Sequence, residues 1–415
     1  MSKKILVTAF FIETLCVTYF LSVDWLVPIA TVLYFVSGIA VAISLLFLPQ
    51  SKLQFQKPGK YIRTLNGYKL VGLGMMAAVM CHLGYRFMDD APLDFHDSDM
   101  LPIIKVMSQR FWQGNTSHVY DTIPEIWNGI KPIYLPAMWL PFSIAEKLHI
   151  DIRWVTILAL FFAFSAGILL WDPFKRKKLS LPFVVAAFLL FWFLFATDSP
   201  GLVPYTEEGV VIINYVWLAI ALLSGNYVFI GVAASLCALS RYALVGWLPA
   251  MLILLYVQGK TKQWIHLKIS GIVCFALLVL WPFGWQLVGN LMKLPAEYID
   301  FAARVWKDGP QVFETSLGFA KFFGPHRIAL QHNLLIILSF TVPTFFVLFC
   351  VWRNYKNNAG LNNISIAALK IALVIFYCFI DVPYLYLFYT SSFVSFILVA
   401  YWLSQGEKRE VLAVA

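Results

Sequence analysis

The stretch DFHDSDMLPIIKVMSQRFWQG, residues 94–114, interrupts a chain whose other segments are mostly apolar enough to be embedded in a lipid bilayer. Five aspartates fall between positions 89 and 99, and an amphipathic run follows them. Ionised carboxylates are costly in the hydrocarbon core of a bilayer. The chain must therefore leave the membrane here, and the segments on either side can be placed relative to this point.

The composition indicates a polytopic membrane protein of the all-α class. Of the 415 residues, 60% are hydrophobic and only 13% are charged, whereas soluble domains carry about 25% charged residues. Apolar runs of about 20 residues, the length of a membrane helix, recur along the chain. The net charge of +9 comes from short basic clusters between these runs, where membrane topology explains it. We therefore expect no nucleic-acid partner.

Hydropathy predicts about twelve membrane helices. They are expected near 5–22, 25–48, 69–88, 152–172, 179–197, 210–224, 227–240, 243–258, 269–289, 333–352, 364–381 and 384–404. With the N-terminal lysines inside, nearly all inner loops are basic and the acidic cluster lies outside, so both termini are expected inside. The segment 133–148 is short and holds two prolines, and we expect it to lie in the outer interface.

The sequence predicts a single membrane domain. Two N-terminal helices (1–68) precede a core (69–289) that contains a first outer loop (89–151), and a second outer loop (290–332) and C-terminal helices (333–415) follow. The six cysteines lie in apolar segments without a CxxC pair, so we expect free thiols. Glu13 lies within the first helix, where we expect it to pair with a neighbouring helix, and Asp381 is expected at an outer helix end.

The run after the aspartates has the period of an α-helix. Met100, Ile103, Ile104, Met107 and Phe111 share one face. The prediction is a helix lying in the outer interface with its apolar face down. A serine at position 98 can cap its start, a glycine at 114 can end it, and the aspartates at 97 and 99 suit its positive N-terminal end.

Four short segments carry a resemblance to a known family. They are HVYD (118–121), KPIYLPAMWLPF (131–142), EEGVVIINY (207–215) and LSRYALVGWLP (239–249). With the acidic first outer loop, this pattern over residues 69–289 resembles the GT-C superfamily of membrane glycosyltransferases, and most of all family 87. The resemblance implies a GT-C-like fold, a polyprenyl-phosphate sugar donor such as a mannose donor, and action on the outer, periplasmic face of a plasma (inner) membrane.

The same resemblance implies that an aspartate of the first outer loop is the catalytic base. Its distance from the glycine that ends the interfacial helix fits Asp99 best, then Asp97, then Asp94. The sequence departs from the family pattern in two places. Ala137 stands where a second proline is usual, and Glu207 or Glu208 stands where a glutamine is frequent.

Sugar transfer from a lipid phosphate needs a base for the acceptor hydroxyl and positive charge for the departing phosphate. Arg241, a rare cation between two apolar segments, is the predicted phosphate clamp, because a guanidinium pairs well with phosphate. Direct attack would invert the anomeric configuration. The other predicted substrate-binding residues are Tyr242, His326, Arg327, Glu207, Glu208, Tyr134 and Lys131.

Neither an HxH nor an HExxH spacing occurs, and we expect no metal cofactor, although acids such as those of DFHDSD can by themselves hold Mg²⁺ or Mn²⁺. The expected partners are the sugar donor, a lipid or glycan acceptor and membrane lipids. Two other functions stay open. One is a polysaccharide polymerase or ligase that uses a lipid-linked oligosaccharide, and the other is a transporter, for which no internal repeat is visible.

Overall fold

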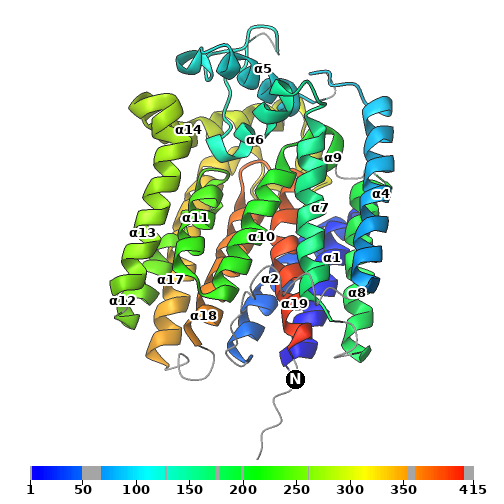
Figure 1. Cartoon of the computed structure of the whole chain (residues 1–415), viewed down its shortest axis with the longest axis vertical. Coiled ribbons are helices and arrows are strands. Elements are labelled where there is room, and N and C mark those ends of the chain that lie inside the picture. The colour runs from blue at the N-terminus through cyan, green and yellow to red at the C-terminus, as the bar shows by residue number, and fades with distance from the viewer. Residues whose placement is uncertain are drawn as a thin grey trace, which may run out of the picture.

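The computed structural model describes residues 2–48, 67–96, 98–126, 129–172, 177–197, 201–259, 261–353 and 360–405. Within these ranges the chain is helical, and β pairing is limited to one isolated antiparallel bridge between Ile123 and Ile130. The helices run side by side along the long axis of the molecule (Figure 1).

Nine helices of the described residues are long and apolar enough to cross a membrane. Their helical cores are α1 (Ser2–Val17), α2 (Val27–Leu46), α4 (Gly67–Asp90), α7 (Arg153–Leu170), α8 (Lys177–Phe195), α13 (Thr261–Phe275), α17 (Ile328–Trp352), α18 (Gly360–Phe379) and α19 (Phe388–Ser404). Three shorter apolar helices are α10 (Glu208–Ser224), α11 (Tyr227–Ala238) and α12 (Leu248–Gln258). The prediction of an all-α polytopic membrane protein is confirmed, and the count of twelve spans stays a prediction.

The span expected at 269–289 is displaced in the structure. α13 already begins at Thr261, so most of the basic stretch that we placed in an inner loop is helical. Its Lys268 ammonium lies 3.3 Å from the centre of the Trp264 ring. Tryptophan and lysine are both frequent where a helix meets the membrane surface. After a π-helical turn, Ala276–Leu280, the chain bends at Gly284 (φ 66°, ψ −170°), a conformation that only glycine adopts readily, within α14 (Trp281–Asp308).

The first outer loop forms two helices at one end of the bundle, α5 (Met100–Trp112) and α6 (Pro136–Lys147), with part of α14 at the same end (Figure 1). The predicted stripe of α5 is largely buried, and the Trp112 indole donates a hydrogen bond to the Ser143 carbonyl at 2.6 Å. Gly114 has a φ of 81° just after the helix, as expected. Ser98 does not cap α5, because its hydroxyl instead donates to the Tyr205 carbonyl at 3.3 Å.

The C-terminal helix forms the centre of the bundle. α19 is buried along almost its whole length and contacts α1, α7 and α10. α1 packs against α2, α8 and α19, and its Glu13 is buried. The six cysteines are free thiols, as expected, and Cys81 is the exposed one among them.

A buried arginine fixes the point where the chain leaves the bundle toward the acidic loop. Arg153, at the start of α7, donates hydrogen bonds to the carbonyls of Phe87, Met88 and Ala91 at the end of α4. Its guanidinium also pairs with Asp151 at 2.7 Å. The carbonyls of Met88 and Ala91 thereby gain a donor at the end of α4, whereas the Phe87 carbonyl also accepts from the Ala91 amide at 3.1 Å.

We predict that Arg153→Met lowers the free energy of unfolding by about 3 kcal/mol, because it leaves buried carbonyls and Asp151 without their donor. Arg86→Met is the matched control, since the Arg86–Asp90 pair of α4 is exposed on both sides and such pairs contribute little. Thermal unfolding in detergent measures both variants. Equal losses in the two would contradict this role of Arg153.

Candidate functional site

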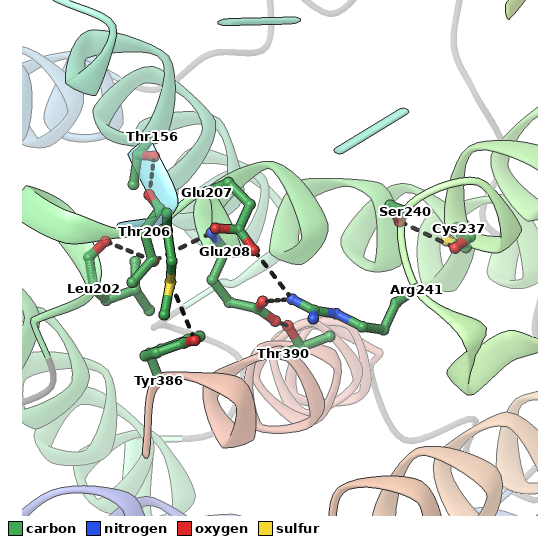
Figure 2. A network of polar contacts seen from close by, with 11 residues as sticks. Thr156, Leu202, Thr206, Glu207, Glu208, Cys237, Ser240, Arg241, Tyr386 and Thr390 are labelled. Carbon is green, nitrogen blue, oxygen red and sulfur yellow. Dashed lines mark hydrogen bonds and ion pairs between the residues drawn. The ribbon is translucent and has the colours of Figure 1, made fainter. Parts of the chain in front are cut away.

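Three predicted residues form one buried ion cluster in the half of the bundle that carries α5 and α6. Arg241 lies just before the 3-10 turn η4 (Tyr242–Leu244), and its Nη2 pairs with Glu208 and lies 3.5 Å from Glu207 Oε1. Glu208 is fully buried and Glu207 is 2% exposed. The hydroxyl of Thr390, from α19, donates to Glu208 Oε1 at 2.5 Å. Figure 2 shows the Arg241 side chain directed at the two glutamates.

The turn that presents the glutamates is held by threonine hydroxyls. Thr206 donates to the Leu202 carbonyl at 2.8 Å and accepts from the Glu208 amide at 3.2 Å. Thr156, from α7, donates to the Thr206 carbonyl at 2.8 Å (Figure 2). A Cβ on Gly209 would come within 2.8 Å of Thr156 atoms, so glycine is needed for this close contact between α7 and α10.

Two buried polar atoms of this cluster have no hydrogen-bond partner among the described residues. One is a donor, Nε of Arg241, and the other is an acceptor, Oε2 of Glu207. Most buried polar groups in folded proteins are paired, so each exception calls for an explanation. A bound ligand that accepts from Arg241 and donates to Glu207 would satisfy both atoms.

Asp99 lies beside this cluster, at the start of α5. It is half-buried, and its side chain makes no capping hydrogen bond to the helix. Burial raises the pKa of its carboxyl above the usual value. Burial and the nearby charge of Asp99 also raise the pKa of Tyr384 to about 12. A carboxylate with these properties can accept a proton from a hydroxyl.

The sequence neighbours of Asp99 tie it to the cluster. The Ser98 hydroxyl bonds the carbonyl of Tyr205, two residues before Glu207. On the other side, the Tyr386 hydroxyl lies 3.2 Å from the sulfur of Met100. Tyr134 is buried nearby, and burial, Glu207 and Asp99 together raise the pKa of its hydroxyl.

The remaining predicted residues lie elsewhere or outside the described chain. Asp94 is exposed and contacts His96 at 2.7 Å, and hydrogen bonds from His96 lower the pKa of its carboxyl. Asp97 lies outside the described residues. The structure leaves Lys131, His326 and Arg327 on the surface of the outer loops, the last two in the 3-10 turn Pro325–Arg327.

The structure holds an apolar cavity of about 280 Å³. It is lined by side chains of α11, of α13 and α14, and of the segment before α6. The lining side chains include Leu135, Leu239, Tyr242, Phe275 and Val288. Two of its lining residues are chain neighbours of predicted site residues, since Tyr242 directly follows Arg241 and Leu135 directly follows Tyr134. Tyr242 also meets the ring of Tyr298 edge-on.

Some polar residues of the cluster were not singled out in the sequence. Thr390 and Tyr386 belong to the aromatic run that opens the last apolar helix, where a neutral hydroxyl gives no distinguishing signal. A second buried pair joins His332 Nδ1 to Asp381 Oδ2 at 2.7 Å, which places the expected outer-end aspartate. Within the described ranges no three His, Cys, Asp or Glu side chains are grouped to hold a metal; metal independence stays a prediction.

We predict that Arg241→Gln lowers the free energy of unfolding by about 3–5 kcal/mol, because Glu208 is then left buried without its counter-ion. Adding Glu208→Gln should recover part of this loss, since both charges are then removed. Glu207→Gln alone should cost less, because its Oε1 lies 3.5 Å from the guanidinium and its Oε2 has no partner. Thermal unfolding of the native chain, of Arg241→Gln, Glu208→Gln and their double variant, and of Glu207→Gln measures these effects. A double variant that loses the sum of the two single losses would contradict the coupling.

Comparison with known proteins identifies no relative: no family model, curated protein or solved structure matches the chain. The likeness of residues 69–289 to a glycosyltransferase family therefore stays a prediction. The function of the cluster must follow from its own contacts and charges.

Proposed function

We propose that the chain is a membrane glycosyltransferase of the GT-C type, most like family 87. It moves a mannose-like hexose from a polyprenyl-phosphate donor to a lipid or glycan acceptor. The observation that carries this proposal is the pair of unpartnered buried atoms, Arg241 Nε and Glu207 Oε2, in neighbouring side chains, with Asp99 near enough for its charge to act on Glu207. A glycosyl phosphate suits both atoms, because its phosphate oxygens accept hydrogen bonds and its sugar hydroxyls donate them.

The contacts divide the work among the charged residues. Glu208 accepts hydrogen bonds on both oxygens, from Thr390 and from Arg241, and so acts as the counter-ion that orients the guanidinium. Arg241 then holds the donor phosphate, and Glu207 holds a sugar hydroxyl. Asp99 accepts the proton of the acceptor hydroxyl as that oxygen bonds to the anomeric carbon. The bond from this carbon to the phosphate oxygen breaks, polyprenyl phosphate leaves, and the anomeric configuration is inverted.

The apolar cavity supports a lipid-linked donor. Its lining combines Tyr242, the chain neighbour of Arg241, with residues of α11, α13 and α14. A chain of isoprene units would bury its first methylene and methyl groups there, and each buried CH₂ contributes about 0.8 kcal/mol. The donor would thus enter from the membrane, with its sugar at the end that carries α5 and α6. We place this end on the periplasmic side of a plasma (inner) membrane.

A transporter is the rival for which the structure offers a specific observation. The Glu13–Lys370 pair is fully buried within membrane helices, and ionisable residues at depth frequently mark transport pathways. The three N–H groups of Lys370 have three acceptors, namely Glu13 Oε1 and the carbonyl and hydroxyl oxygens of Ser391. A transport site would keep hydrogen-bonding capacity for its cargo, so the completed contacts favour a structural role for this pair.

We predict that the purified protein transfers sugar from a member of a polyprenyl-phosphate sugar panel, or hydrolyses it. Asp99→Asn should lower the rate about 10²–10⁴-fold, because the base is lost. Asp94→Asn, in the same loop but exposed and turned to His96, is the matched control and should keep near-native activity. Mass spectrometry of the product and thermal unfolding of each variant separate lost chemistry from lost folding. Full activity in a folded Asp99→Asn protein would rule out the assigned base.

We also predict an acidic limb in the pH profile. The base works only when ionised, and burial raises the pKa of Asp99, so the rate should fall as the pH drops through that raised value. The midpoint should therefore lie above the value of about 4 for an exposed aspartate. A profile of kcat/KM against pH gives this midpoint. A limb at or below pH 4, or one that persists unchanged in the residual activity of Asp99→Asn, would contradict the assignment.

A further inference from the structure

A buried ion pair between Glu13 and Lys370 lies deeper in the bundle, where side chains of α1, α18 and α19 meet. The Lys370 ammonium lies 2.6 Å from Glu13 Oε1, and both side chains are 0% exposed. Lys370 also donates to the carbonyl of Ser391 at 2.9 Å and to its hydroxyl oxygen at 2.6 Å. The Ser395 hydroxyl donates to Glu13 Oε2 at 2.7 Å, and Ser392 approaches Oε1 at 3.3 Å. One face of α19 is thus bound to this ion pair.

Stability alone is a weak reason for such a pair. Removing two charges from water costs several kcal/mol, and apolar replacements of buried ion pairs are frequently neutral or stabilising. The pair instead supplies directional hydrogen bonds between helices. Its hydrogen bonds specify the rotation and height of α19 relative to α1 and α18, which apolar packing specifies less sharply.

The residue next to Ser391 connects this cluster to the candidate site. Thr390 donates to Glu208, and Glu208 holds Arg241. Polar contacts therefore run from Glu13 through Lys370 to Ser391. From its chain neighbour Thr390 they continue through Glu208 to Arg241. Hydrogen bonds weaken within a few tenths of an ångström of their optimum, so the 2.5 Å contact of Thr390 depends on the placement of α19.

We propose that Lys370, with Glu13, is a positioning residue of the candidate site. It fixes the first turns of α19 so that Thr390 meets Glu208 and the guanidinium of Arg241 is held ready for the donor phosphate. The effect on catalysis rests on the proposed function, whereas the coupling of the Glu13–Lys370 pair to the Thr390–Glu208 contact does not. Two tyrosines brace the same part of α19, since Tyr34 donates to the Phe388 carbonyl at 3.0 Å and Tyr389 donates to the Val17 carbonyl at 2.9 Å.

The kinetic test compares Glu13→Gln/Lys370→Met, which removes both buried charges together, with Thr390→Val. Both should raise KM for the polyprenyl-phosphate sugar about tenfold, the effect of one lost hydrogen bond to a charged group, while kcat changes little because Asp99 is untouched. Thr390→Ser keeps the hydroxyl and should restore the native KM. Lys69→Met is the control for general destabilisation, because Lys69 binds carbonyls at the opposite end of α7 from Thr156, the α7 residue that contacts the candidate site. It should lower the unfolding midpoint and leave KM unchanged.

A second measurement does not depend on activity. Thr390→Val should lower the thermal unfolding midpoint of the native protein by more than it lowers that of Glu13→Gln/Lys370→Met, because the contact it removes is already weakened there. Ser391→Ala removes only one of the three Lys370 contacts and serves the same comparison if the double variant does not fold.

The two measurements separate the proposals. Additive midpoint losses would overturn the positioning role, as would a native KM in the folded double variant. If the native protein neither transfers nor hydrolyses any sugar of the panel, the proposed function fails, and the midpoint comparison alone then decides the positioning role.

Discussion

The pairing of Arg241 with two consecutive glutamates is the interaction on which the arrangement of this protein depends. A guanidinium inside a membrane protein is tolerated only when its charge and donors are met. Here the partners come from three separate parts of the chain, at positions 207–208, 241 and 390. Their meeting brings together the ends of α10, α11 and α19 and so defines the outer part of the bundle.

The same pairing explains why the middle helices are short. α10, α11 and α12 have 17, 12 and 11 residues, fewer than the roughly 20 that span a bilayer. The chain leaves the helical state before α10 and after α11, where the charged side chains lie. Irregular backbone at such depth must be buried in protein with its polar groups satisfied. The hydroxyls of Thr206 and Ser240 do part of this, each bonding a carbonyl of the preceding helix.

Sequence reasoning succeeded where one physical signal dominates. Continuous apolar runs predicted the spans, and a helical period predicted α5 with its buried stripe. Cations are rare between apolar segments, which is why Arg241 could be selected from the sequence. Glu207 and Glu208 were selected because they occupy the polar turn of the family pattern. Asp99 was favoured by the spacing that the family resemblance implies, and in the structure it lies near enough for its charge to act on Glu207.

What could not be predicted depends on contacts between distant segments. The partner of Glu13 is Lys370, 357 positions away, and apolar periodicity does not specify which helices become neighbours. Thr390 is a neutral residue in an apolar helix, so its contact with Glu208 had no visible sign. Ser98 was predicted to cap a helix, but its hydroxyl donates to the carbonyl of Tyr205, which is distant in the sequence. The start of α13 was missed because its basic residues suit a loop and a helix end equally well.

The ion cluster around Glu13 and Lys370 differs from the one around Arg241 in how completely its hydrogen bonds are satisfied. Around Glu13 and Lys370, both carboxylate oxygens and all three N–H groups of the ammonium have partners within the described chain. Around Arg241, one donor and one acceptor have no partner within the described chain. A buried polar atom without a partner costs about 1–3 kcal/mol. Under the proposed function the donor phosphate and sugar would remove that cost, so the incomplete cluster would bind the donor and the complete one would support it.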